Sequence, residues 1–446
     1  MNSIINRLHL FFFTIALIIF LYVFYRSEIH HEGSIRNYYL PYYFISIFII
    51  FLGFVSLFLK NENKKNLLTS LISIFFSFYL LEVLILVSKN YQTESDKKSK
   101  IYYNETGENY DKRSAFEAYL EEKIKNPELK IKIGPHDYIN ELNIDFLPLS
   151  GISNSFTFYC NENGYYSYYN TDRHGFRNPD FEWDKDIIDY LLVGDSFTLG
   201  ACVNSPNDIS GNLRNLFKSK SILNLGYGGN GPLISYSVLR EYLPQKKVKN
   251  ILFLFYEENE LEDLINELKN PILKKYFNNK SFSQNLFSRQ EEIDKTNILK
   301  IENEIEKFDK SQSMEMKLKF KQSLKLFRIR NIIKNIFKKD EVIIPSNTPE
   351  FETILIKFKN LAEANNSNFY FVYLPTYYRY DNKFNNLIYK ETLDLLNKLQ
   401  INLINIKDSF DQHSNPKSLF PFEMYGHYNL DGYRFVSKKI FEFFNN

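Results

Sequence analysis

The stretch that decides the fold of this 446-residue chain is YLLVGDSFTLG, residues 190–200. Its first four residues form an apolar run that is typical of a buried parallel strand. The glycine-flanked turn after this run carries Ser196. In an open α/β sheet, reacting groups gather outside the carboxyl ends of the strands. A serine in such a turn presents its hydroxyl and its own backbone N–H to one cavity, so we predict that Ser196 is a nucleophile.

A serine nucleophile needs a base, and the chain offers one near its C-terminus. His427 lies in MYGHYNLDG, residues 424–432, just ahead of an amphipathic stretch from Tyr433 to Phe444. A serine hydroxyl is a poor nucleophile until a neighbouring imidazole takes its proton. We therefore predict that His427 is the general base for Ser196, although the two residues lie far apart in the chain.

Four blocks of sequence between Trp183 and the C-terminus resemble those of the SGNH hydrolases, also called the GDSL family. The first block is GDSF with Ser196, and the fourth contains His427. The resemblance implies that these two residues are the catalytic nucleophile and base. Asp195 stands beside the serine, and we expect its carboxylate to brace the turn rather than to take part in the chemistry.

The second and third blocks carry the residues that the resemblance assigns to an oxyanion hole. NLGYGGNGP, residues 224–232, has Gly229 at the family's oxyanion-hole glycine. FLFYEENE, residues 253–260, has Asn259 at the oxyanion-hole asparagine, although its acidic neighbours are not the usual ones. The backbone N–H groups of Ser196 and Gly229 and the side-chain amide of Asn259 are thus three expected donors to a tetrahedral oxyanion.

The fourth block departs from the family pattern at the residue that orients the histidine. The family has an aspartate two or three residues before the catalytic histidine, whereas this chain has Met424 and Tyr425 there. Glu423 is the nearest carboxylate and is our candidate for the orienting group. The alternatives are that Asp431 or a backbone carbonyl holds the imidazole of His427, that serine and histidine act as a dyad, or that activity has decayed.

The remaining apolar runs predict one doubly wound α/β domain. Five runs have the length of strands, and four stretches with helical spacing lie among them. Such an alternation favours right-handed crossovers of a parallel sheet, so we predict a flavodoxin-like three-layer α/β/α sandwich, which is the SGNH hydrolase fold. The expected strands are Ile187–Val193, Ser221–Leu225, Asn250–Tyr256, Asn368–Leu374 and Ile401–Ile406, and the expected helices are Asp208–Phe217, Leu233–Tyr242, Phe351–Ala364 and Asn386–Leu399.

A segment upstream of the first strand, TDRHGFRNPD at residues 171–180, resembles a G-F-R-N lead-in found in many bacterial members of the family. We interpret it as structural, while Arg177 has a functional alternative in binding an acidic group of a substrate and His174 a weaker one. His136 and His413 belong to no pattern. Because neither H-x-x-x-H nor clustered Cys/His spacing occurs, we predict no metal site and no cofactor.

The N-terminal ninety residues contain three apolar stretches of about 18–22 residues, namely Leu8–Tyr25, Tyr38–Leu59 and Leu67–Ser88. A helix rises about 1.5 Å per residue, so each stretch can cross a bilayer core of about 30 Å. We therefore predict a multi-pass anchor in the lipid bilayer. Glu82 is the one acidic residue of the third stretch. Its carboxylate makes a polar contact between helices, faces the lumen of a helix bundle, or snorkels to the interface.

The positive-inside rule does not decide the orientation of this anchor, because the positive charges on its two sides nearly balance. Arg7 and the loop at residues 60–65 place the N-terminus inside, whereas the lysines between residues 89 and 100 oppose that placement. The resemblance favours the inner membrane of a bacterium, with the catalytic domain in the periplasm, because similar anchored proteins act on secreted or lipid-linked glycans.

We divide the chain into an anchor at residues 1–90, an extracytoplasmic linker at 91–182 and an SGNH hydrolase-like domain at 183–446. The last contains a helical insertion at about 261–346, which ends in a basic stretch with interspersed apolar residues, Lys317–Lys339. That stretch suits either contact with a membrane surface or a lid or side subdomain whose apolar face packs on the sheet. Nucleic-acid binding is not expected, since no recognition fold accompanies the charge. The net charge of +2 decides nothing about partners.

The two cysteines, Cys160 and Cys202, are too few for a disulfide scaffold. They form either one bridge, which an oxidising compartment would permit, or two buried thiols. A bridge would tie the linker that carries Cys160 to the active-site turn. It would stabilise the fold by about 4 kcal/mol on a loop-entropy estimate.

These features together predict a membrane-anchored serine esterase or O-acyltransferase that forms an acyl-serine intermediate. The expected substrate is an acylated glycan or another small ester, most specifically an O-acetyl group on a sugar, and the acceptor is water or a glycan hydroxyl. Other membrane proteins of glycan assembly are expected partners. The alternative is a catalytically impaired domain that binds a glycan as an accessory to export or assembly, because the usual aspartate is missing.

Overall fold

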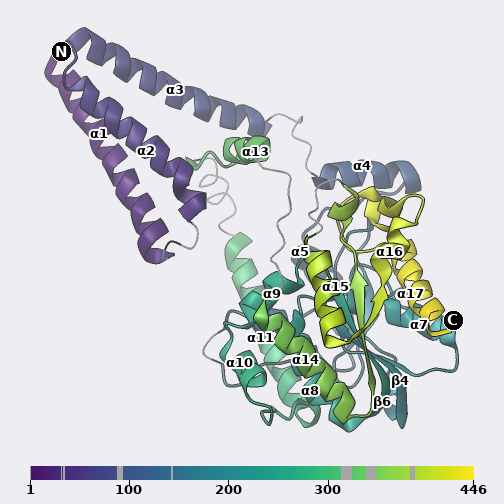
Figure 1. The fold of residues 1–446 in the computed structure, drawn as a ribbon. Coiled ribbons are helices and arrows are strands. Elements are labelled where there is room, and N and C mark those ends of the chain that lie inside the picture. The colour runs from purple at the N-terminus through teal and green to yellow at the C-terminus, as the bar shows by residue number, and fades with distance from the viewer. Residues whose placement is uncertain are drawn as a thin grey trace. The chain divides into compact units, whose positions relative to one another are not determined.

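The computed structural model describes residues 2–31, 33, 36–87, 94–141, 144–312, 324–337, 348–381 and 387–445. The chain forms two compact units (Figure 1). The first comprises Met1–Tyr91 and Ser313–Lys338, and the second comprises Gln92–Gln312 and Lys339–Asn446.

This division differs from the one expected from the sequence in two places. The expected linker at 91–182 lies almost entirely in the same unit as residues 183–312, and the expected insertion at 261–346 is shared between the two units. Parts of that insertion, residues 313–323 and 338–347, lie outside the described residues, and Lys317 is among them.

A parallel sheet of five strands forms the centre of the second unit, in the order β5-β4-β6-β7-β8. The first strand along the chain lies between the second and the third, which is the flavodoxin-like arrangement. The expected strands and fold class are therefore confirmed. The strands are β4 (Ile187–Gly194), β5 (Ile222–Asn224), β6 (Lys247–Tyr256), β7 (Asn368–Leu374) and β8 (Asn402–Asn405).

Helices cover both faces of this sheet because the side chains of each central strand alternate between two cores. In β6, Phe253 and Phe255 pack in one core while Leu252 and Leu254 pack in the other. The first core is covered by α8 (Pro232–Tyr242), α14 (Pro349–Ala364) and α15 (Leu387–Leu399), and the second by α7 (Ile209–Phe217), α16 (Ile406–Asp411) and α17 (Leu430–Asn445) (Figure 1).

The part of the insertion that belongs to this unit packs onto the first core. Its helices are α9 (Glu260–Glu267), α10 (Pro271–Asn278) and α11 (Gln290–Gln312). Each helix buries apolar side chains there, such as Leu264, Leu273 and Ile293. These helices form a side subdomain, which is one of the two roles considered for the insertion.

The segment expected to be a linker, residues 91–182, is a folded part of the second unit where the structure describes it. It contains α4 (Glu94–Thr106), α5 (Ala115–Lys125) and a small sheet in the order β1-β2-β3, which the sequence did not predict. The strands of that sheet are β1 (Lys130–Ile131), β2 (Phe156–Phe158) and β3 (Tyr168–Asn170). Fully buried Asp172 accepts hydrogen bonds from Asn178 and from Trp183 Nε1, so the segment is fastened to the residues just before β4.

The first unit contains three helices that are long and apolar enough to cross a membrane. They are α1 (Asn2–Phe24), which continues as a π-helical turn to His30, α2 (Arg36–Ser56) and α3 (Asn61–Val87). The apolar segments span Phe13–His30, Tyr38–Ser56 and Asn61–Ile85. The predicted number of spans is confirmed, although the third begins earlier than expected.

A fourth helix of this unit, α13 (Phe327–Phe337), comes from the basic stretch of the insertion and packs against α3. Buried Glu82 of α3 lies 3.2 Å from the guanidinium of Arg328 and accepts a hydrogen bond from the backbone N–H of Ile329. Of the roles considered for Glu82, the polar contact between helices is the one observed. The described part of the basic stretch therefore belongs to the first unit and does not form a lid on the sheet.

Candidate active site

Ser196 lies where the sequence places it, at the carboxyl end of the central strand β4. It begins the short helix α6 (Ser196–Leu199), and buried Asp195 caps this helix by accepting a hydrogen bond from the backbone N–H of Phe197 at 2.9 Å. Gly194 has a φ of +150°, and a Cβ there would lie 2.3 Å from Thr198 Oγ1. Only glycine fits this close approach, which turns the chain sharply from strand to helix.

The imidazole of His427 lies directly against this serine. Its Nε2 atom is 2.8 Å from Ser196 Oγ, although the two residues are 231 positions apart. The histidine stands on the loop before α17, and its ring packs against Phe197 with centroids 4.8 Å apart. A general base must lie within hydrogen-bond reach of the proton it takes, and His427 meets this condition.

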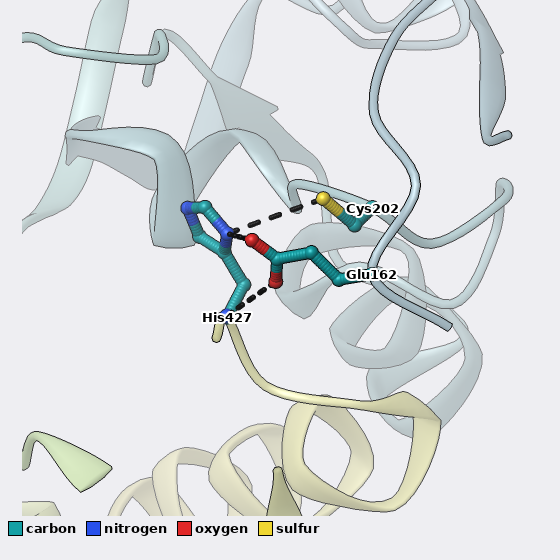
Figure 2. Close-up of side chains that lie close together, drawn as sticks. All are labelled: Glu162, Cys202 and His427. Atoms are coloured by element: carbon teal, nitrogen blue, oxygen red, sulfur yellow. Dashed lines mark hydrogen bonds and ion pairs between the residues drawn. The ribbon is translucent and has the colours of Figure 1, made fainter. Parts of the chain in front are cut away.

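The group that orients His427 is Glu162, in the connection between β2 and β3. One carboxylate oxygen lies 3.0 Å from Nδ1, and the other accepts a 2.6 Å hydrogen bond from the backbone N–H of His427 (Figure 2). A carboxylate cannot donate when it is ionised, so Nδ1 carries the proton and Nε2 is free to accept one from Ser196. Ser196, His427 and Glu162 therefore form a continuous hydrogen-bonded chain.

The prediction that Glu423 orients the imidazole is wrong. Its carboxylate accepts a hydrogen bond from the side chain of Asn415 at 2.8 Å. Asp431, the alternative carboxylate, pairs instead with Arg434. The prediction failed because it considered only carboxylates beside the histidine, whereas the fold supplies Glu162 from 265 positions away. The sequence did contain one signal, because a bridge from Cys160 would bring this segment to the active-site turn.

The histidine and the glutamate shift each other's protonation in opposite directions. Burial lowers the pKa of His427, but the negative charge and hydrogen bond of Glu162 outweigh it, so this pKa is raised. Burial raises the pKa of Glu162, but the charge and hydrogen bonds of His427 outweigh it, so this pKa is lowered. Both side chains keep 24% of their surface exposed, so the pair is not sealed from solvent.

Two of the expected oxyanion donors, Gly229 and Asn259, contact other polar side chains. Gly229 has a φ of +83°, and its carbonyl oxygen lies 3.0 Å from Nδ1 of exposed His136, a residue to which the sequence assigned no role. Asn259 donates one amide hydrogen to Asp263 at 2.7 Å. Since an amide nitrogen carries two hydrogens, the second remains for another acceptor. Burial, and then the charge of Asp195, raise the pKa of Asp263 to about 7.

The lead-in residues with functional alternatives have structural surroundings. Arg177 is 3% exposed, donates to the backbone oxygens of Gly200 and Val203, and pairs with buried Asp208. His174 is buried against Trp183, and burial lowers its pKa to about 4. The contacts of Arg177 hold the loop that follows the nucleophile.

A disulfide joins Cys160 to Cys202, so the bridge is the alternative observed for the two cysteines. Among the described residues, Glu162, Cys202 and His427 are the one set of potential metal ligands whose atoms lie within 4.8 Å of one another (Figure 2). A metal-binding cysteine must be a thiolate, and the sulfur of Cys202 is bonded to Cys160. This set therefore does not fit a metal ion.

No protein-family model and no curated protein match this chain. Similar solved structures include two proteins described as lipolytic and of the G-D-S-L family, one from Desulfitobacterium hafniense DCB-2 and one from Veillonella parvula DSM 2008. Each is 11% identical and covers 58% of this chain and 99% of its own, with TM-scores of 0.31 and 0.32.

Proposed function

We propose that this protein is a membrane-anchored serine esterase of the SGNH type, in which Ser196, His427 and Glu162 are the catalytic triad. The observation that carries the proposal is the continuous hydrogen-bonded chain from Ser196 Oγ through the imidazole to the carboxylate of Glu162. Geometry of this kind identifies a triad on any fold, whatever the positions of its members in the sequence.

In the first half of the reaction, Ser196 Oγ attacks the carbonyl carbon of an ester while His427 Nε2 takes the hydroxyl proton. The carboxylate of Glu162 stabilises the imidazolium that forms. The tetrahedral intermediate then collapses, the bond to the leaving oxygen breaks, and Nε2 returns the proton to that oxygen. The products of this half are an alcohol and an acyl-serine.

In the second half, an acceptor hydroxyl attacks the acyl-serine and His427 takes its proton. The bond between the acyl carbon and Ser196 Oγ then breaks, and Nε2 returns the proton to Oγ. Water as acceptor gives a carboxylic acid, and a sugar hydroxyl gives a transferred ester. In both halves we assign stabilisation of the oxyanion to the backbone N–H groups of Ser196 and Gly229 and to the second amide hydrogen of Asn259.

For the substrate, we infer an O-acyl group, specifically O-acetyl, on an exported or cell-surface glycan. Three helices can anchor the chain in a membrane. The Cys160–Cys202 disulfide supports a catalytic unit that faces out of the cell, because such bridges persist in oxidising compartments such as the periplasm. The alternative of a glycan-binding accessory rested on the missing aspartate. No specific observation favours it once Glu162 is placed on His427.

A serine-reactive fluorophosphonate tests the proposal on the full chain purified in detergent. We expect labelling of the wild type, none of Ser196→Ala and strongly slowed labelling of His427→Ala. Hydrolysis of 4-nitrophenyl acetate should follow the same order, and adding an acetylated or free oligosaccharide would separate hydrolysis from transfer. A folded wild-type protein that neither labels nor hydrolyses the ester would refute the assignment.

A further inference from the structure

The connection that carries Glu162 is held by two kinds of contact. Within the connection, Tyr159 N–H donates to the carbonyl of Ser167, and Ser167 N–H donates to that of Cys160. These bonds shape the connection but do not locate it relative to the sheet that carries the nucleophile. The disulfide and a hydrogen bond from the side chain of Asn163 to the carbonyl of Cys202 at 2.9 Å join the connection to the loop after Ser196 close to the glutamate. Further away, the backbone N–H of Tyr168 donates to Asn204 of the same loop at 2.8 Å, and Asn161 and Gly164 are hydrogen-bonded to Asp111.

The other end of the disulfide is built into the nucleophile's own turn. Cys202 is fully buried and follows Ala201, whose backbone N–H donates to the carbonyl of Ser196 and whose carbonyl accepts a hydrogen bond from Tyr433 of α17. The sulfur of Cys202 lies 4.0 Å from His427 Nδ1, the same atom that Glu162 contacts (Figure 2). The bridge therefore runs alongside the imidazole, with its far end two residues from Glu162.

We propose that the Cys160–Cys202 disulfide is a positioning element of the triad, which keeps Glu162 on His427 and makes full activity conditional on the oxidised state. The proposal rests on the proposed function and adds a redox requirement to it. Opening the bridge leaves every catalytic side chain chemically intact. What it removes is the covalent link between the two segments that supply the acid and the nucleophile.

The physical reason lies in how narrow the working geometry of such a site is. A catalytic group must be held within about 0.5 Å of its productive position. A misplacement of about 1 Å costs roughly 100-fold in rate. With the bridge open, the covalent link next to Glu162 is lost, and the glutamate keeps its own contacts with His427 and the neutral hydrogen bond of its neighbour Asn163 to the loop after Ser196. The other hydrogen bonds of the connection, such as those of Asn161 and Gly164 to Asp111, join it to residues before β1 and not to the nucleophile's loop. We therefore expect reduction to slow the chemistry by roughly 100-fold, within the larger loss that removal of the carboxylate would cause.

The experiment compares the full chain in detergent in four forms: wild type, Glu162→Gln, Cys160→Ala/Cys202→Ala, and the triple variant. Rates of fluorophosphonate labelling are measured before reduction, after reduction with a phosphine and after reoxidation. We expect reversible slowing of the wild type, a slow double alanine variant that is insensitive to reductant, and a Glu162→Gln protein that reduction does not slow further. Equal slowing of wild type and Glu162→Gln, or none in the wild type, would overturn the proposal, because the bridge would then not act through Glu162.

A second measurement reads the position of Glu162 without any reaction at the serine. Diethyl pyrocarbonate modifies neutral imidazole, so the pH dependence of its reaction at His427, followed by peptide mass spectrometry, reports the pKa of this side chain. Because Glu162 raises that pKa, we expect it to fall in the double alanine variant towards the value in Glu162→Gln. An unchanged pKa in the double alanine variant would contradict positioning by the bridge. Absence of labelling in every form would instead refute the proposed function, while the pKa comparison would still decide the role of the bridge.

Discussion

The nucleophile and the acid of this site reach His427 from two regions that are built differently. Ser196 stands at the end of β4, a central strand of eight residues that pairs with neighbours on both sides. Glu162 stands on the connection between β2 and β3, which have three residues each. The remaining strand of that sheet, β1, has two residues. The first region is held by ladder hydrogen bonds and two hydrophobic cores, and the second largely by side-chain contacts and one disulfide.

This difference indicates that the position of the nucleophile is fixed by the sheet, whereas the orientation and pKa of His427 can be altered through Glu162. Changes at the nucleophile act on the chemistry directly, since its backbone cannot move without the sheet. Changes around Glu162 alter the orientation and the pKa of His427 and leave the nucleophile in place. The predictions below test this division, beginning with the largest expected effect.

Ser196→Ala should remove the reaction almost completely. Loss of the serine of a triad costs about 10⁶-fold in kcat, and the rate that remains comes from binding and the oxyanion hole. The measurement is kcat for 4-nitrophenyl acetate, with Ser418→Ala as a control, because that hydroxyl caps only the turn at Asn415. Activity of Ser196→Ala within tenfold of the wild type would place the nucleophile elsewhere.

Glu162→Gln should lower kcat by about 10³–10⁴-fold, since an amide at this position no longer fixes the tautomer of His427 or stabilises the imidazolium. Glu423→Gln is the matched control, with the same chemical change at the carboxylate that the sequence favoured. We expect it to stay within about twofold of the wild type, because Glu423 contacts Asn415 and not the imidazole. If Glu423→Gln were the slower of the two, the assignment of the acid would be reversed.

Asn259→Ala should lower kcat by about 10²–10³-fold with little change in KM, because an oxyanion donor acts mainly in the transition state. A suitable control is Asn266→Ala on α9, whose side chain accepts a hydrogen bond from Lys269. A change confined to KM would show that Asn259 binds the substrate and does not stabilise the oxyanion.

The smallest expected effect is a shift of the pH profile. Only neutral His427 can act as a base, so kcat/KM should fall as the pH drops through its pKa. Glu162 raises this pKa, and its removal should therefore move the acid limb of the residual activity in Glu162→Gln to lower pH. A limb that stays in place or moves to higher pH would mean that Glu162 is not charged beside His427 in the working enzyme.

Local patterns in the sequence were enough to determine the sheet, the three membrane-spanning candidates and the positions of Ser196 and His427. Each depends on residues close together in the chain. Apolar runs of strand length mark buried strands, long apolar runs mark spans, and the GDSF turn follows its strand directly. The pairing of Ser196 with His427 was expected from the family resemblance, and in the structure the two residues lie 2.8 Å apart.

Only the tertiary structure decided which carboxylate serves His427, whether the cysteines are bridged, and what Glu82 contacts. Glu162 has no motif of its own, and its partner lies 265 positions away. Glu82 likewise finds Arg328 from a distant helix. The physical reason is the same in each case. Strand and helix periods follow from backbone geometry within a few residues, whereas an ion pair or disulfide depends on which distant segments the packed cores bring within a few ångströms.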